Sequence, residues 1–363
     1  MHKLSINLVV YNGAPYIPFL MASLKNQTFK DFEMIIVDNA STDGTVDLIK
    51  NELADLGIEY RLIQNSENLG FAHGHNQAYK ITRTPYLALV NADMHLMPDA
   101  LEKIVKFLDI HTDTAAVAPR LMRWDFTLTR TAKESGANIQ EAVRQGFTSQ
   151  IDAIGIRLFR SRRAVEWLTR QDWAKDSASV DVQKIYDKNV VEIFGVSGAF
   201  AIYRKSVVDN VLLPGGDMFD ATYHSYKEDL DLAYRLRNAG FMSYVILDSV
   251  VYHDRHGGGP KRMSDWAAAK NKTTQSFFIS FHSYKNHLRT LYKNEYWQNF
   301  LIDLPFIFWY EFKKLIYLLL TNPKVVFRGW GEIIKYAKYT REARCAVIKS
   351  RRMYWKGLRR WWL

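Results

Sequence analysis

The sequence predicts an α/β protein with a doubly wound, mostly parallel sheet, followed by a basic helical extension. Three observations support this fold class. Strand and helix patterns alternate over the first 120 residues, several of these strands end in Asp or Asn, and the positive charge lies near one end of the chain. Residues 261–363 carry 21 Lys and Arg against 6 Asp and Glu, while the rest of the 363-residue chain carries 28 against 32. We therefore expect an α/β domain over residues 1–260 and a helical, basic and aromatic region over residues 261–363.

The composition narrows the class of protein. Hydrophobic residues make up 48% of the chain and charged residues 24%, as in ordinary globular domains. A single cysteine, Cys345, excludes an internal disulfide and fits a reducing compartment. No run of 18 or more uncharged apolar residues is present, so we expect no membrane-spanning helix.

Apolar runs predict the strands, and the spacing i, i+3, i+4, i+7 predicts the helices between them. The predicted strands are residues 4–10, 32–37, 60–63, 86–90, 115–118 and 244–247. Predicted helices begin near Ile17, at Thr45, which is expected to be an N-cap, and near Leu101. A further helix ends at Gly240. Residues 123–191 are less regular and rich in arginine, which indicates an insertion that covers the site and shapes its acceptor side.

Asp38 follows a buried strand and precedes a turn of small polar residues. In open α/β sheets, ligands bind outside the carboxyl ends of the strands. A carboxylate there can accept a hydrogen bond from a base N–H or a ribose hydroxyl, but would repel phosphate. The position predicts a nucleotide held by its nucleoside end; the alternative is a surface loop with an Asx-turn.

Asp93 closes the segment Asn91-Ala92-Asp93 after another strand. One carboxylate, diphosphate oxygens and water can hold Mg²⁺ or Mn²⁺, which would neutralise charge on a departing nucleoside diphosphate. His253 follows a strand and could complete this metal site as a neutral imidazole. The alternatives are a turn or cap for Asp93 and a structural role for His253.

Glu228 and Asp229 start the helix that ends at Gly240. They either complement the helix dipole, or one of them is a general base that takes a proton from an acceptor hydroxyl. Asp231 is expected to face away into solvent. The glycines of residues 68–76 are expected to let backbone approach a ligand, although no Walker or Rossmann glycine motif is present.

Six segments in chain order resemble those of family 2 glycosyltransferases of the GT-A fold, over about residues 4–257. They are most similar to bacterial rhamnosyltransferases that build surface polysaccharides. The segments are Val9-Val10-Tyr11-Asn12, Val37-Asp38-Asn39-Ala40-Ser41-Thr42-Asp43-Gly44-Thr45, Asn68-Leu69-Gly70-Phe71, Asn91-Ala92-Asp93, Ser197-Gly198-Ala199 and Tyr226-Lys227-Glu228-Asp229-Leu230-Asp231-Leu232. Residues 151–155, followed by arginines, resemble a segment of some of these enzymes.

The resemblance implies an inverting displacement at the anomeric carbon of a nucleotide-sugar. Asp229 would be the base, with Glu228 beside it, and Asp93 with His253 would hold the metal. The usual Asp-x-Asp is here Asn-Ala-Asp, which leaves one carboxylate and puts tight metal binding in doubt. The implied nucleotide-sugar-binding residues are Val9, Tyr11, Asn12, Asp38, Asn39, Asn68, Gly70, Asn76, Asn91, Ala92 and Asp93.

The last 15 residues, 349–363, interleave cations with Trp and Tyr. On one helix, Tyr354, Leu358 and Trp361 would form a stripe, as in helices that lie in an anionic membrane interface. Residues 306–310, followed by two lysines, suggest a second contact. The alternatives are packing against the α/β domain, or nucleic-acid binding, which we do not expect.

Together these features predict a peripheral, metal-dependent, inverting glycosyltransferase at the cytoplasmic face of a bacterial inner membrane. It would move L-rhamnose from dTDP-rhamnose to a lipid-linked glycan. One alternative is a UDP-sugar-dependent enzyme of the same fold. Another is a sugar-phosphate nucleotidyltransferase, although the glycine-rich phosphate loop that such an enzyme needs after the first strand is absent.

Overall fold

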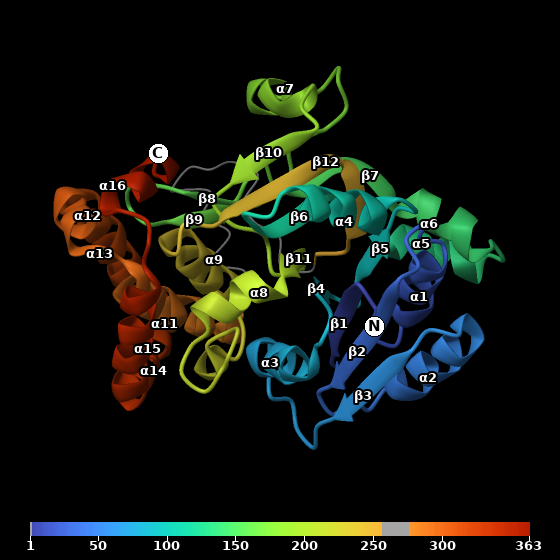
Figure 1. Cartoon of the computed structure of the whole chain (residues 1–363), viewed down its shortest axis with the longest axis horizontal. Coiled ribbons are helices and arrows are strands. Elements are labelled where there is room, and N and C mark those ends of the chain that lie inside the picture. Colours follow the sequence, from blue (N-terminus) through green and yellow to red (C-terminus); the bar gives the residue numbers. More distant parts are fainter. Residues whose placement is uncertain (1, 256–275) are drawn as a thin grey trace.

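A large twisted sheet runs through the centre of the computed structural model, which describes residues 2–255 and 276–363 (Figure 1). Within the described residues ten strands form this sheet, in the order β10-β12-β6-β11-β4-β1-β2-β3, with β5 paired to β12 and β7 to β6. The expected boundary between residues 260 and 261 lies outside the described residues. The sheet and its helices confirm the predicted fold class.

The N-terminal half of the sheet is parallel, as predicted. Its strands are β1 (Leu4–Val10), β2 (Phe32–Asp38), β3 (Tyr60–Gln64) and β4 (Tyr86–Val90). The helices between and after them are α1 (Ile17–Lys25), α2 (Thr45–Leu56), α3 (Phe71–Ile81) and α4 (Ala100–Ile110). The N-cap of α2 is Gly44, with φ 84°, and not Thr45 as expected. The Thr45 hydroxyl instead accepts a hydrogen bond from the Gly13 backbone at 2.9 Å, which ties the loop after β1 to α2.

The other half of the sheet mixes directions because β11 lies antiparallel between β4 and β6. Its strands are β5 (Met94–Leu96), β6 (Thr114–Trp124), β11 (Phe200–Arg204) and β12 (Met242–His253). Strands β6 and β12 are much longer than residues 115–118 and 244–247, the lengths predicted. They pair with each other as far as Arg123 and His253, so ladder hydrogen bonds keep polar residues extended where the apolar pattern ends.

The predicted insertion, residues 123–191, is more regular than expected. Strand β7 pairs with β6 and β10 pairs with β12, so the segment extends the sheet. Strand β7 is largely polar, and β8, β9 and β10 have three or four residues each, so a search for apolar runs missed them. The elements are α5 (Phe126–Glu134), α6 (Ile139–Gly146), β7 (Phe147–Ala153), β8 (Ile156–Leu158), β9 (Ala164–Glu166), α7 (Val180–Tyr186) and β10 (Val190–Ile193).

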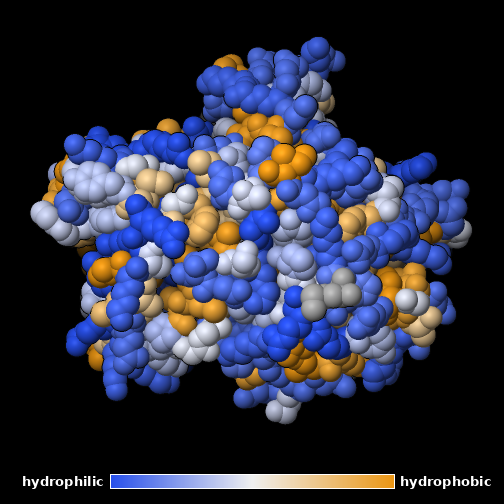
Figure 2. Space-filling view, in the orientation of Figure 1, coloured by the Kyte–Doolittle hydropathy of each residue, from blue (hydrophilic) through white to orange (hydrophobic). Residues whose placement is uncertain are grey.

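Each face of the sheet buries its own apolar core. Helices α1, α2 and α4 pack on one face. Helices α3, α8 (Lys205–Val208) and α9 (Glu228–Asn238) cover the other. Two short 3₁₀ helices, η1 (Asp209–Val211) and η2 (Ala221–Tyr223), lead from α8 toward α9. The face seen in Figure 2 is mostly hydrophilic, with hydrophobic residues in small separate groups.

The C-terminal helices form a separate bundle, drawn in orange and red in Figure 1. In it α11 packs on α14, α15 and α9. None of the helices in the described residues is both long and apolar enough to cross a membrane. The helices are α11 (Phe277–Asn294), α12 (Trp297–Ile302), α13 (Leu304–Thr321), α14 (Pro323–Lys335), α15 (Ala337–Ser350) and α16 (Trp355–Leu358), followed by the 3₁₀ turn η3 (Arg359–Trp361).

The expectation that residues 349–363 form one interfacial helix is wrong. Helix α15 ends at Ser350, and the chain then folds back onto the insertion, where Leu358 and Trp362 are buried. The Trp362 ring lies 3.6 Å from the guanidinium of buried Arg162, which pairs with Glu295 and Asp303. Packing on the α/β domain, one of the alternatives, is therefore how this tail is used.

Candidate active site

The carboxyl ends of β1, β2 and β4 bring the predicted donor residues to one edge of the sheet. Val10 pairs in register with Asp38, so Tyr11 and Asn12 follow immediately beside the end of β2. A β-carbon on Gly13 would lie 3.3 Å from the β-carbon of Ala92, which places the loops after β1 and β4 in contact. Strand order reverses between β1 and β4, which is where ligands bind in doubly wound sheets.

Asp38 makes the predicted turn and lies at this edge. Its side chain is almost fully buried, and both carboxylate oxygens lie 3.2 Å from the backbone nitrogen of Ser41. Asn12, at φ 52°, accepts a hydrogen bond from the Thr42 backbone at 2.8 Å and so joins the two loops. Tyr11, the aromatic residue that the sequence predicted at this edge, is 54% exposed.

Asn39 and Asn76 lie behind this edge and bind protein groups. The Asn39 amide donates to the Gly70 carbonyl at 3.2 Å. Asn76 donates to the Phe219 carbonyl and accepts from the Phe219 nitrogen, both at 2.9 Å. Asn68 accepts a hydrogen bond from the Gly70 nitrogen at 3.0 Å.

The glycines of residues 68–76 allow close internal packing, and the approach of a ligand to their backbone stays a prediction. A β-carbon on Gly70 would lie 2.6 Å from the His224 ring, and one on Gly74 would lie 2.7 Å from Val9. Gly70 also has φ 85°, which disfavours any other residue.

The end of β12 brings His253 to Asp93, although the two are 160 positions apart in the chain. His253 is the last residue of β12 and pairs with Met94, and the Asp254 nitrogen donates to the Asp93 carbonyl at 3.1 Å. The Asp93 carboxylate lies 3.5 Å from His253 Nε2. The structure thus brings together the two predicted metal-binding side chains. Asn91, whose nitrogen donates to the Ala199 carbonyl at 3.3 Å, leads into the same loop.

Asp152, from the insertion, is a site residue that our sequence-based assignment missed. It is fully buried and lies 2.8 Å from His253 Nδ1. Arg255 lies 3.0 Å from the same carboxylate and reaches Glu166 at 3.4 Å. The resemblance of residues 151–155 to a family segment was the one signal that could have indicated Asp152.

Two carboxylates control the charge of His253. Burial opposes a charge on this ring, but Asp93 and Asp152 more than offset burial and raise the pKa of His253 to about 9. Asp152 itself is buried, yet Arg255 and His253 keep its pKa below the ordinary value. A metal-binding histidine typically gives its second nitrogen to a carboxylate in this way.

The donor set fits a divalent cation shared with a ligand. Among the described residues, no three His, Cys, Asp or Glu side chains form a metal-binding group. Asp93 and His253, however, hold an oxygen and a nitrogen 3.5 Å apart, and a cation that takes the place of the Nε2 proton could bind both. Mg²⁺ usually keeps several waters and shares substrate phosphates, so two protein ligands suffice.

Glu228 and Asp229 differ sharply although they are adjacent. Glu228 is buried, and burial followed by the charge of Asp229 raises the pKa of Glu228 to about 8. Burial and the neighbouring carboxylate therefore favour the protonated form of Glu228. Asp229 is half-buried; its oxygens accept hydrogen bonds from the Gly198 nitrogen at 3.1 Å and the Leu230 nitrogen at 2.7 Å. A β-carbon on Gly198 would lie 3.3 Å from that of Asp229, so the Ser-Gly-Ala motif leaves room for this carboxylate.

Asp231 does not face solvent as expected. It is fully buried and lies 3.1 Å from Arg235 and 2.9 Å from Lys293. The prediction failed because α11, which supplies Lys293, packs against α9 and covers this side of it.

Residues 5–212 match the family model described as glycosyl transferase family 2. The chain belongs to this family. The glycosyltransferase is 37% identical over 101 residues to a teichoic acid poly(glycerol phosphate) polymerase of Staphylococcus epidermidis, a match that covers 28% of this chain and 14% of that protein. Further matches to proteins of Bacillus subtilis and Haemophilus influenzae cover 44% and 36% of those relatives.

Another relative matches over most of its length. The glycosyltransferase is 24% identical over 292 residues to the N-acetylglucosaminyl-diphospho-decaprenol L-rhamnosyltransferase of Mycobacterium tuberculosis, covering 77% of this chain and 85% of that one.

Solved structures support the GT-A fold. A Pyrobaculum calidifontis mannosyltransferase in complex with GDP-Man and Mn²⁺ has a TM-score of 0.50 and 16% identity, covering 96% of this chain and 86% of that one. GalNAc-T7 with UDP, GalNAc and Mn²⁺ has a TM-score of 0.55 and 12% identity, covering 81% and 48%.

Proposed function

We propose that this glycosyltransferase is an inverting enzyme that moves L-rhamnose from dTDP-rhamnose to a hydroxyl of a lipid-linked surface glycan. The observation that carries the proposal is the meeting of Asp93, His253 and Asp152 at the carboxyl edge of the sheet. The donor loops lie at this edge as well. The mycobacterial relative, which is a rhamnosyltransferase of a lipid-linked acceptor by name, supports the choice of sugar and acceptor.

The donor would bind along the loops after β1, β2 and β4. Asp38 would accept from a base N–H or ribose hydroxyl, and Tyr11 and Val9 would hold the nucleoside. The diphosphate would lie along the loops after β1 and β4, next to Asn12, Asn91, Ala92 and Asp93. Asn39, Asn68, Gly70 and Asn76 would support this wall from behind, since their contacts are to protein groups.

Asp93 and His253 would hold Mg²⁺ or Mn²⁺ together with the donor diphosphate. When bound, the ion would neutralise negative charge as the nucleoside diphosphate leaves. Asp152 would keep His253 oriented so that Nε2 faces Asp93.

Asp229 would act as the general base. An acceptor hydroxyl would attack the anomeric carbon, the bond from this carbon to the diphosphate oxygen would break, and Asp229 would take the hydroxyl proton. Attack from the side opposite the leaving group inverts the configuration. Glu228 is the weaker candidate because it is buried, which limits its access to an acceptor and raises its pKa.

Membrane attachment would use α12, α13 and α14, since the tail is packed away. Exposed apolar side chains gather on these three helices. From residue 276 to 363 the chain carries 17 Lys and Arg against 5 Asp and Glu, and Glu295, Asp303, Glu311 and Glu332 are all in ion pairs. Exposed aromatic residues beside cations, such as Trp309 with Lys313, suit the interface of an anionic bilayer. The exposed side chains are Trp297, Phe300, Leu301, Ile302, Leu304, Phe306, Phe308, Trp309, Phe312, Ile316, Leu320, Phe327, Trp330 and Ile334.

A turnover assay with a short lipid-linked acceptor tests the function. The purified protein should release dTDP from dTDP-rhamnose with Mn²⁺ or Mg²⁺, and Asp229→Asn should lower kcat at least about 10³-fold while dTDP still raises Tm. Transfer from a UDP-sugar but not from dTDP-rhamnose would show that the donor is a UDP-sugar. Pyrophosphate release from dTTP would indicate a nucleotidyltransferase, and normal turnover by Asp229→Asn would refute the assignment of the base.

Vesicle flotation tests the membrane surface. The protein should float with anionic phosphatidylglycerol vesicles and not with phosphatidylcholine vesicles, and the pair Phe308→Ser and Trp309→Ser should reduce flotation. Leu128→Ser, which alters an exposed apolar residue on α5, is the control. Equal flotation of all variants would exclude α13 as the contact.

A further inference from the structure

The backbone between η2 and α9 adopts an unfavourable conformation immediately before the proposed base, Asp229. His224, Tyr226 and Lys227 have φ of 63°, 70° and 73°. Residues with a β-carbon seldom adopt this left-handed region, and such strain persists only where surrounding contacts enforce it. The segment 219–227 must therefore be held from outside.

The side chain of Asn286, on α11, contacts the strained part of this segment at three backbone carbonyls. Its amide nitrogen lies 3.1 Å from the Tyr223 carbonyl, 3.0 Å from that of Ser225 and 2.8 Å from that of Tyr226. Asn286 is fully buried, so water cannot replace these hydrogen bonds. One amide thus gathers three carbonyls of the strained turn.

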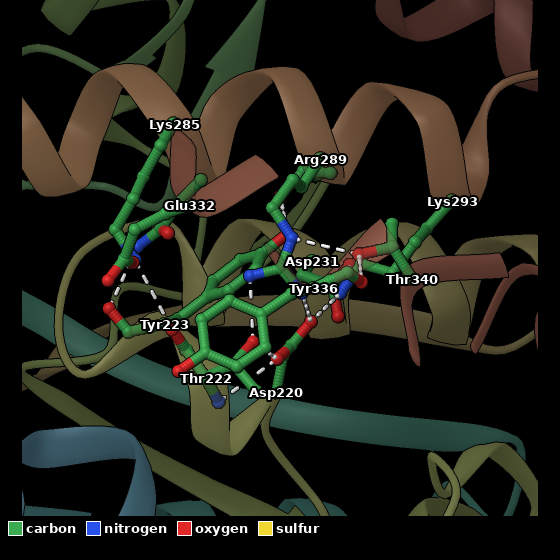
Figure 3. Close-up of polar contacts among 12 residues, drawn as sticks. Asp220, Thr222, Tyr223, Asp231, Lys285, Arg289, Lys293, Glu332, Tyr336 and Thr340 are labelled. Carbon is green, nitrogen blue, oxygen red and sulfur yellow. Dashed lines mark hydrogen bonds and ion pairs between the residues drawn. The ribbon is translucent and has the colours of Figure 1, made fainter. Parts of the chain in front are cut away.

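Other side chains of α11 bind the same segment. His282 Nδ1 lies 2.9 Å from the Tyr223 carbonyl, and the Tyr223 hydroxyl lies 2.9 Å from that of Thr290. One turn further along the helix, Lys293 reaches Asp220 at 2.7 Å and Asp231 at 2.9 Å (Figure 3). In Figure 3, Lys285, Arg289 and Lys293 extend from α11 toward the segment.

The segment also connects the two sides of the site. On the donor side, Phe219 bonds with Asn76 and the Ala72 nitrogen donates to the His224 carbonyl at 3.0 Å. On the other side, the Lys227 carbonyl accepts from the Asp231 nitrogen at 2.9 Å, which is the first turn of α9. The position of Asp229 therefore depends on where residues 223–227 lie.

We propose that Asn286 is a positioning residue that aims the Asp229 carboxylate by holding the turn at residues 223–227. This inference rests on the proposed function, because it needs Asp229 as the base. It makes the C-terminal bundle a working part of the active site and not only an attachment to a membrane. Asn286 touches neither donor nor acceptor, so its loss should affect turnover more than donor binding.

Asn286→Ala tests this proposal, with Asn238→Ala as the matched control. Asn238 is also a fully buried asparagine that donates to one carbonyl, that of Asn294 at 3.1 Å, but it lies at the far end of α9. In the full-length protein, Asn286→Ala should lower kcat about 10- to 100-fold and change the Kd for dTDP less than twofold. Amide hydrogen exchange at residues 225–230 should quicken at least tenfold. Asn238→Ala should leave kcat and this exchange within threefold.

Equal losses of kcat in both variants, or normal kcat and exchange in Asn286→Ala, would overturn the proposal. If Asn286→Ala does not fold, Asn286→Ser, which keeps one donor, is measured instead with the same expected direction. The exchange measurement needs no substrate. A wild-type protein that transfers no sugar would therefore refute the proposed function, while exchange would still decide whether Asn286 holds the turn.

Discussion

The donor side and the base side of the active site are held by different kinds of contact. On the donor side, most side chains bind uncharged backbone groups: Asp38 binds Ser41 and Asn68 binds Gly70 close by in the sequence, while Asn76 reaches Phe219 from another element. Around the metal-binding residues and the base, charged side chains meet: Asp152 meets His253 across 101 positions, and Lys293 meets Asp231 across 62. The donor side is thus held largely by side-chain contacts to backbone, whereas the base side depends on charged pairs between distant elements.

The two sides also differ in buried charge. Asp220 and Asp231 are fully buried, and Lys293, Arg289 and Arg235 neutralise them. Removing one partner of a buried ion pair leaves the other charge unneutralised in a medium of low dielectric constant, which lowers the stability of the folded protein. The comparison predicts that single substitutions cost more stability on the base side than on the donor side.

The largest effect on stability is expected for Lys293→Met. This change leaves Asp220 and Asp231 with less neutralising charge, and breaking a buried ion pair typically costs about 3–5 kcal/mol of unfolding free energy. Urea denaturation measures it. Lys184→Met, which removes an exposed pair with Asp181, should cost less than about 1 kcal/mol. Similar losses in both would show that burial does not set the cost of breaking these ion pairs.

Asp152→Asn should weaken Mn²⁺ binding about 10- to 100-fold, since removal of a carboxylate behind a metal-binding histidine has effects of this size. Isothermal titration of Mn²⁺ into the protein with saturating dTDP measures the Kd. Asp176→Asn, an exposed carboxylate on the same insertion, is the control. Unchanged Mn²⁺ affinity in Asp152→Asn would separate this residue from the metal site.

His75 on α3 should make the donor side sensitive to acid. Burial alone lowers the pKa of His75 from 6.5 to about 3. The pKa of His75 is lower in the folded than in the unfolded protein. The unfolding free energy is therefore unaffected by this residue well above pH 6.5 and decreases as the pH falls from 6.5 toward 3. At pH 5.5 the loss is on the order of 1 kcal/mol. His75→Leu should remove this part of the pH dependence in thermal unfolding at pH 5.5 and 8; an unchanged dependence would show that His75 does not cause it.

The smallest effect is expected for a single hydrogen bond of the donor loops. Thr45→Val keeps the shape of the side chain but leaves the Gly13 N–H without its acceptor, at a cost of about 1 kcal/mol. Thr45→Ser keeps the hydroxyl and should hold Gly13 in place. The difference in unfolding free energy between the two variants measures the two hydrogen bonds of this hydroxyl, one accepted from Gly13 and one donated to Asp43. A difference near zero would show that the loop finds other partners.

Prediction from the sequence succeeded where the signal was local. Strand β1 was predicted with its observed bounds, and the Asp38 turn was found where expected. The strands β6 and β12 were predicted too short, and β7 was missed, because pairing with neighbours and not apolar pattern keeps their polar residues extended. The prediction that Tyr354, Leu358 and Trp361 form one stripe on a membrane-binding helix was wrong. A basic and aromatic composition suits acidic partners within the protein, such as Asp303, as well as it suits a lipid surface.

The sequence by itself determined the fold class, the family motifs and the strand ends that carry Asp38 and Asp93. These follow from side-chain periodicity and from turn chemistry, which act over a few residues. The tertiary structure decided which groups meet: Asp152 with His253, Asn286 with the turn before Asp229, and Lys293 with Asp231. Such pairs join elements far apart in the chain, so their contacts depend on how the insertion and the C-terminal bundle pack against the sheet.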